Sequence, residues 1–319
     1  MWSYLVRRVA QAILILFIIT MLCFILTRLS SDPMAQYANK PGITAADRAA
    51  IAKSLGLDQP LPVQYIRWIG LALQGNLGNS FFSKQPVLTM IEQRLPLTLI
   101  LMGTAEVVII IVALTLGLVA AVKQYSFVDN LITSFSFIGY SMPIFFIAFG
   151  SIEIFAVQFK VWGLPYLPTG ADIWDPKDPL ALARHLVLPV FSLVAIQTAG
   201  YSRYLRSSIL EVLGMDYVRT AHAKGLSNRA VLFKHALRNA ILPFVTIVGL
   251  DIPFLLGGAL VTESIFAWPG MGRLFWEYAE RGDYPVVLGV LLVTSTAVVF
   301  FTIIVDLAYT IIDPRIRLS

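Results

Sequence analysis

The sequence predicts an all-α integral membrane protein with about six transmembrane helices. Hydrophobic residues make up 57% of the 319 positions and charged residues only 13%, whereas soluble domains have roughly 45–50% apolar and about 25% charged residues. The apolar residues are gathered into long runs separated by polar stretches. A run of about 20 apolar residues crosses the hydrocarbon layer as a helix, which satisfies its own backbone hydrogen bonds. One large soluble core would not produce this pattern.

The first apolar run extends over residues 9–29 and follows Arg7 and Arg8. A secretory signal peptide has a shorter apolar core of about 7–15 residues and ends in a cleavage site of small residues. The run here is longer, and residues 28–33 (RLSSDP) make a poor cleavage site. We therefore expect an N-terminal transmembrane helix over 1–30 that is not removed.

Residues 31–95 are polar and mixed, and we expect them to form an external segment with short helices. Thr44 can cap a helix over 45–55. Residues 63–73 have apolar positions at helical spacing, as in an amphipathic helix at a membrane surface. A folded external loop explains the same residues equally well.

Five further spans are predicted within a five-helix core over 96–312, and residues 313–319 form a tail. The fourth span is short and contains Pro189, Gln197 and Thr198. An even number of spans places both termini on the same side of the membrane. The five spans cover approximately residues 97–122, 131–157, 186–198, 241–261 and 286–311.

Basic residues predict the orientation, because Lys and Arg collect on the cytoplasmic side of membrane proteins. Both ends of the chain are basic, and so is the stretch between the fourth and fifth spans. We therefore expect both termini and this stretch in the cytoplasm. The net charge of +5 does not indicate a nucleic-acid partner, because no basic patch alternates with aromatic residues. The basic residues of the stretch are Arg203, Arg206, Arg219, Lys224, Arg229, Lys234 and Arg238.

Within this stretch, residues 211–239 are too polar to cross the membrane and predict two helices. The first ends at Gly225, which can adopt the left-handed conformation of a helix terminus, and the second begins after Ser227 as N-cap. We expect the turn to expose Ala221, Ala223 and Gly225, whose small side chains would let another protein approach closely. The alternative is a solvated loop whose charges only set the topology.

The same residues resemble a known family. Arg219-Thr220-Ala221, with Gly225 four residues later and closure by Ile241-Leu242-Pro243, is similar to the coupling signature of binding-protein-dependent ABC importer permeases. The signature often begins with Glu, where this chain has Arg219, and its second half is longer here; both features resemble the dipeptide, oligopeptide, nickel and glutathione branch. Further segments resemble that branch in the right order, and they lie at 56–61, 75–80, 263–272, 281–285 and 313–317.

The resemblance implies a type I ABC importer permease in the inner membrane of a bacterium, forming half of a pathway for di- or oligopeptides. Nickel, glutathione or another small solute is the alternative cargo. The implied partners are a second, homologous permease expected to be a paralogue, two cytoplasmic ATPase subunits and an external solute-binding protein. ATPase coupling is expected through residues 216–235. The residues that match the coupling signature are Tyr217, Arg219, Thr220, Ala221, Ala223, Lys224, Gly225 and Leu226.

The chain itself is not expected to be an enzyme. It contains no phosphate-binding loop of the form GxxxxGK[ST], so ATP and Mg²⁺ would be bound by the partner subunits and no cofactor by this chain. His185, His222 and His235 are not spaced as metal ligands. No residue reads as an activated nucleophile.

Four acidic residues fall within predicted spans: Glu106, Glu153, Asp251 and Asp306. Charges at that depth are costly and usually face a bundle interior or a watery cavity. A structural role, in which each acid is hydrogen-bonded between helices or is neutral, is the favoured interpretation. Asp251 is the best candidate to line a translocation cavity and to hold a peptide's amino group, and Glu153 and Glu106 are further candidates. A proton-driven secondary transporter is the rival hypothesis, but it leaves the turn at Gly225 unexplained.

Overall fold

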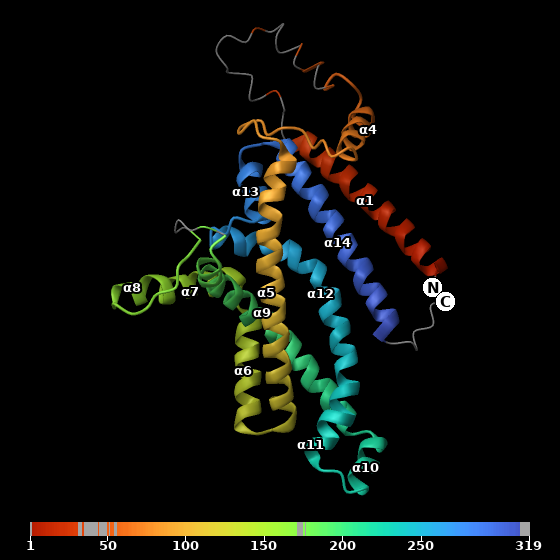
Figure 1. Ribbon diagram of the computed structural model, residues 1–319, viewed down its shortest axis with the longest axis vertical. Helices are drawn as coiled ribbons and strands as arrows, with labels where there is room; N and C mark the ends of the chain where they lie inside the picture. The colour runs from red at the N-terminus through yellow and green to blue at the C-terminus, as the bar shows by residue number, and fades with distance from the viewer. Residues whose placement is uncertain are drawn as a thin grey trace. The chain divides into compact units, whose positions relative to one another are not determined.

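The computed structural model contains six helices that are long and apolar enough to cross a membrane, within the residues that it describes. The prediction of about six transmembrane helices is therefore confirmed. Apart from an isolated bridge between Asn79 and Pro86, the regular structure of the described chain is helical (Figure 1). The structure describes residues 2–30, 34, 44, 50, 52–53, 56–170, 175 and 177–312.

The chain forms two compact units, and neither is continuous in sequence. Unit 1 contains residues 1–97 and 270–300, and unit 2 contains residues 98–269 and 301–319. Two long helices, α5 (Val87–Val122) and α14 (Tyr284–Ile312), contribute residues to both. The predicted tail over 313–319 lies outside the described residues.

In unit 1 the helix α1 (Trp2–Ser30) packs against α4 (Leu61–Ala72). Phe24 and Tyr65 are buried between them with their rings edge to face, 5.6 Å apart. The Tyr65 hydroxyl also bonds the Thr20 hydroxyl at 2.8 Å. Helix α4 confirms the amphipathic helix expected over 63–73, whereas the helix expected over 45–55 falls almost entirely outside the described residues.

Unit 1 also contains a helix that the sequence did not predict. Helix α13 (Met271–Glu280) begins directly after Gly270 and buries Met271, Leu274 and Tyr278 against the start of α5 and of α14. Its apolar residues recur every three to four positions, which is the spacing of one helical face. No helix was predicted here because these residues lie between the predicted spans over 241–261 and 286–311.

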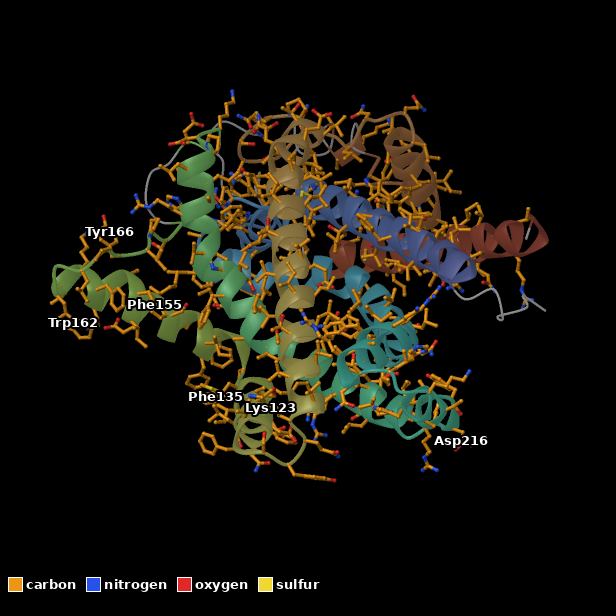
Figure 2. All side chains as sticks on the ribbon, turned by 60° about the horizontal axis from the view of Figure 1, so that its bottom comes forward. Lys123, Phe135, Phe155, Trp162, Tyr166 and Asp216 are labelled. Atoms are coloured by element: carbon orange, nitrogen blue, oxygen red, sulfur yellow. The ribbon has the colours of Figure 1, made fainter. Side chains whose placement is uncertain are left out.

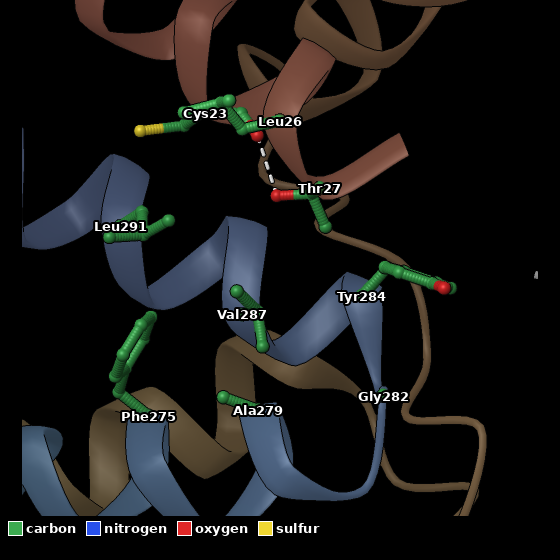
Figure 3. A pocket seen from close by; sticks show the side chains of 9 residues that line it. All are labelled: Cys23, Leu26, Thr27, Phe275, Ala279, Gly282, Tyr284, Val287 and Leu291. Carbon is green, nitrogen blue, oxygen red and sulfur yellow. Dashed lines mark hydrogen bonds between the residues drawn. The ribbon is translucent and has the colours of Figure 1, made fainter. Parts of the chain in front are cut away.

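An apolar pocket of about 260 Å³ lies in the same unit, between α1, α13 and α14 (Figure 3). Its lining includes Cys23, Phe275 and Leu291 and contains no acidic or basic side chain. The Thr27 hydroxyl at its edge is already donated to the Cys23 carbonyl. This pocket therefore offers nothing that would recognise a charged solute.

Unit 2 is arranged around α9 (Pro179–Leu213), which contacts α6 (Phe127–Ser141), α7 (Ile144–Ser151) and α12 (Leu237–Ile265). The span predicted over 131–157 is two helices in the structure. Met142 is extended, with φ −86° and ψ 130°, because proline at 143 disfavours the helical conformation of the residue before it. Beyond α7 the chain continues as a π-helix, η1 (Ile152–Gln158), and a short turn, α8 (Phe159–Val161).

The span predicted over 186–198 was too short, because α9 has 35 residues. Pro189 lies inside the helix and does not end it. Arg203 and Arg206, which we had placed in a loop, extend the helix through its polar half. The polar residues after Thr198 therefore mark the end of the apolar part of the helix, not the end of the helix.

Gly170 is required by close packing in unit 2. A Cβ atom at this position would lie 2.1 Å from the Phe266 carbonyl oxygen, which is backbone and cannot move aside. We expect Gly170→Ala to lower the free energy of unfolding by about 1–3 kcal/mol, measured as a lower melting temperature of the purified protein. Gly200→Ala is the control, because nothing lies within 4 Å of its Cβ position; equal losses in both variants would contradict the prediction.

Candidate functional site

The predicted two-helix segment is present, and the turn between its helices is a Schellman motif. Helix α10 (Asp216–Ala223) ends as expected, with Gly225 in the left-handed conformation at φ +79°. The Gly225 amide donates to the His222 carbonyl at 2.9 Å, and the Leu226 amide donates to the Ala221 carbonyl at 3.3 Å. These are the two hydrogen bonds that define the motif. The turn is thus held by its own backbone.

Ser227 begins the second helix as predicted. Its hydroxyl accepts a hydrogen bond from the Ala230 amide, and the chain continues through α11 (Asn228–Ala230) and the π-helix η2 (Val231–Ala236) into α12. Figure 1 shows α10 and α11 at the same end of unit 2 as the turn between α5 and α6. Single π-helical turns often accompany functional sites, and no feature of the sequence indicates this one.

Two side-chain contacts fix α10 against the following helix. The His222 ring and the Asn228 amide oxygen lie 3.2 Å apart across the turn. The Asn239 amide donates to the Tyr217 hydroxyl at 2.7 Å. Val218 is fully buried on the inner face of α10. These contacts hold α10 in place and leave the turn at Gly225 exposed. We call this turn the braced tip.

The structure exposes most of the predicted coupling residues, with one correction. Ala221 is buried, with 6% of its surface exposed, and not at the tip as expected. It lies three residues after Val218, so both residues share the inner face of α10. Its small size serves packing within this chain. The exposed residues are Tyr217, Arg219, Thr220, Ala223, Lys224, Gly225 and Leu226.

An ion pair that the sequence did not indicate joins α6 to α9. Asp129 accepts two hydrogen bonds from the Arg206 guanidinium, both at 2.7 Å, and a third from the Tyr125 amide at 2.8 Å. The hydrogen bond from Arg206 is the main reason that the pKa of the Asp129 carboxyl lies below its usual range. The Asp129 side chain is 3% exposed and that of Arg206 is 22% exposed. The pair anchors the turn between α5 and α6.

Two of the three predicted cavity acids meet inside unit 2. Glu106 on α5 and Asp251 on α12 are electrostatically coupled to each other and to Tyr201 on α9. Asp251 accepts a hydrogen bond from the Gln197 amide at 3.1 Å. Glu106 is buried and Asp251 half-buried. We call Glu106, Gln197, Tyr201 and Asp251 the acidic cluster.

Glu153 is not part of the acidic cluster. It lies exposed on η1, where it accepts a hydrogen bond from Gln158 at 2.7 Å. Figure 2 shows Phe155, Trp162 and Tyr166 along the same segment, which consists of η1, α8 and the residues that follow them. Asp306 is half-buried on α14. The role of Glu153 in lining a translocation cavity stays a prediction.

The described residues contain no group of three or more His, Cys, Asp or Glu side chains that could hold a metal ion. Unit 2 contains three notable features: the braced tip at Gly225, the ion-paired turn between α5 and α6, and the acidic cluster.

Two family models match the chain. The model for the binding-protein-dependent transport system inner membrane component matches residues 113–318. The model for the N-terminal part of the same kind of membrane component matches residues 1–102. Together they cover nearly the whole sequence.

Individual relatives match at full length. The chain is 40% identical to the oligopeptide transport system permease protein AppB of Bacillus subtilis over 322 residues, covering 99% of this chain and 100% of the relative. It is 36% identical to the dipeptide transport system permease protein DppB of Escherichia coli and 37% identical to the glutathione transport system permease protein GsiC of Escherichia coli, with 99% of both chains covered in each case.

Among solved structures, an amino acid ABC transporter with histidines has a similar fold. The TM-score is 0.51 at 13% sequence identity, covering 69% of this chain and 93% of that chain. At this identity the similarity concerns the fold alone. The predicted permease fold is thereby confirmed.

Proposed function

Because this chain belongs to the family of binding-protein-dependent transport system inner membrane components, we propose that it is the permease subunit of an ATP-driven importer of di- or oligopeptides. It is a multi-pass membrane protein, and it forms half of the translocation pathway. A second, homologous permease supplies the other half. An external solute-binding protein delivers the cargo, and two cytoplasmic ATPase subunits supply the energy.

The observation that carries this proposal is the braced tip at Gly225. Its backbone is fixed by the Schellman motif, and its base is fixed by the contacts of His222 and Tyr217. A segment that transmits the movement of another protein must be both rigid and exposed. We infer that residues 216–235 seat in a groove of one ATPase subunit, so that closure of the ATPase pair on ATP tilts α9 and α12.

This role predicts the orientation of the chain in the membrane. If the tip meets a cytoplasmic ATPase, then both chain ends are cytoplasmic, in agreement with the basic residues near each end. ATP and Mg²⁺ belong to the ATPase subunits, because this sequence has no phosphate-binding loop of the usual form.

Peptide cargo is supported by the names of the relatives, among them oligopeptide and dipeptide permeases. A glutathione permease is nearly as similar, and glutathione is itself a small peptide. Glutathione, nickel or another small solute is therefore the alternative cargo.

The test is reconstitution in lipid vesicles. We expect uptake of short peptides only when the partner permease, both ATPase subunits, the binding protein and ATP are all present. Mass spectrometry of the ligand on the co-purified binding protein identifies the cargo. Accumulation by this chain alone, driven by an ion gradient, would show a secondary transporter and refute the proposal.

A further inference from the structure

Inside unit 2, two side chains of the acidic cluster, Glu106 and Tyr201, lack the hydrogen-bond partners that buried groups normally have. Glu106 is 8% exposed, and neither of its carboxylate oxygens has a hydrogen-bond partner within the described chain. Tyr201 is 2% exposed, and its hydroxyl lies near the Gln197 and Asp251 side chains without forming a hydrogen bond of good geometry. Buried polar groups are nearly always paired, so these two call for an explanation.

The same groups converge on one place. The Tyr201 hydroxyl lies close enough to the Glu106 and Asp251 carboxylates to interact electrostatically with both. The Gln197 amide holds Asp251 in position through the 3.1 Å hydrogen bond. The unpartnered oxygens of Glu106 and Tyr201 therefore come from two helices, α5 and α9, and Asp251 adds a carboxylate from a third helix, α12.

The nearby arginines on α9 do not neutralise this site. Arg203 donates to the Ala199 carbonyl at 3.2 Å, and its guanidinium lies over the rings of Phe137 and Tyr140, at 4.7 and 5.2 Å from their centroids. Arg206 is paired with Asp129. Neither arginine is therefore paired with the acidic cluster.

We propose that the acidic cluster is a subsite for a primary ammonium group of the cargo, such as the amino terminus of a peptide. An ammonium group has three N–H donors and no acceptor. The cluster offers a matching set of acceptors in the two carboxylates and the Tyr201 hydroxyl oxygen. The positive charge also offsets the burial of two carboxylates.

A metal ion fits the site less well. Calcium and magnesium need six or more oxygen ligands in a suitable geometry, and the described residues bring no third acidic or metal-ligating side chain to Glu106 and Asp251. Softer metals prefer His and Cys, and the cluster has neither. Asp251 is the more exposed of the two acids, so an ammonium group would enter from its side.

This inference rests on the proposed function for the identity of the cargo, but it can be tested by binding alone. The assembled complex is placed in nanodiscs without ATP or binding protein and titrated calorimetrically with trialanine and with N-acetyl-trialanine. We expect the wild-type complex to bind trialanine at least tenfold more tightly than N-acetyl-trialanine. Asp251→Asn and Glu106→Gln should each remove that preference, while Glu92→Gln, which changes an exposed acid on α5, should keep it.

Two results would overturn the subsite: no preference in wild type, or a preference that survives in both variants. Both variants keep the side-chain volume. If the Glu106→Gln complex does not assemble, Asp251→Asn alone tests the proposal. ATP-driven uptake of trialanine by the same wild-type complex separates this inference from the proposed function. If the complex takes up trialanine but the titration shows no preference for the free amine, the subsite alone is refuted. If the titration shows a preference that depends on Asp251 but no peptide is taken up, peptide transport alone is refuted.

Discussion

Replacement of Gly225 by valine is expected to reduce ATP-dependent uptake by the assembled transporter to the background of empty vesicles. Gly225 has φ +79°, a conformation that costs a residue with a Cβ about 1–2 kcal/mol. A β-branched side chain there would break the Schellman hydrogen bonds and reshape the exposed tip. Because nothing lies within 4 Å of the Cβ position, the chain should still fold and insert.

The matched control is Gly163→Val. Gly163 also has a positive φ, +68°, and open space around its Cβ position, so the backbone strain is the same at a site away from α10. Uptake, ATP hydrolysis and the amount of ATPase subunit that co-purifies are measured for both variants. Gly225→Asn, which tolerates the left-handed conformation, should retain partial uptake. Normal uptake by Gly225→Val would contradict the coupling role.

Replacement of Asp129 by asparagine is expected to lower the free energy of unfolding by about 2–3 kcal/mol. Removal of one partner leaves the other charge partly buried without compensation, and breaking a buried pair typically costs about 3–5 kcal/mol. We take a lower value because Arg206 is 22% exposed. The melting temperature of the purified protein measures the loss.

The control is Glu277→Gln, which breaks an exposed pair with Arg281 at 3.2 Å. Exposed pairs contribute little, so the melting temperature should barely change. A double variant, Asp129→Asn with Arg206→Gln, should recover part of the loss because no unpaired charge remains. Similar losses for Asp129→Asn and Glu277→Gln would show that the pair between α6 and α9 is not a structural anchor.

The same pair predicts a pH dependence. The pKa of Asp129 is lowered in the folded protein, mainly by Arg206, so the stabilisation is present above the pKa of an unfolded aspartate, about 3.9. It is lost as the pH falls through the lower folded value. We expect the difference in melting temperature between wild type and Asp129→Asn to stay constant from neutral pH to about pH 5 and to shrink below about pH 4.

Local rules in the sequence predicted the functional turn well. Glycine at 225 and serine at 227 are signals for a helix end and a helix start, and both operate over a few residues. The burial of Ala221 could also have been foreseen, because it lies on the helical face of Val218. We missed it because the small residues were interpreted by size and not by face.

Contacts between distant residues could not be predicted in the same way. Asp129 and Arg206 are 77 positions apart, and no periodicity links them. Glu106 and Asp251 were each recognised as costly at membrane depth, but their convergence with Tyr201 depends on how three helices pack. The length of α9 was underestimated for a related reason: hydropathy marks the apolar part of a helix, whereas its hydrogen bonds continue through Arg203 and Arg206.

The unbroken course of the chain from Asn228 through η2 to Ile265 has one further consequence. At 1.5 Å per residue, Asp251 lies about 35 Å along this rod from its beginning beside Gly225. If this stretch moves as one piece it acts as a lever, so a rocking of about 5° at the tip displaces the region of Asp251 by about 3 Å, roughly the length of one hydrogen bond. Leverage of this size would make or break the contacts of a bound solute without any change within the helix itself.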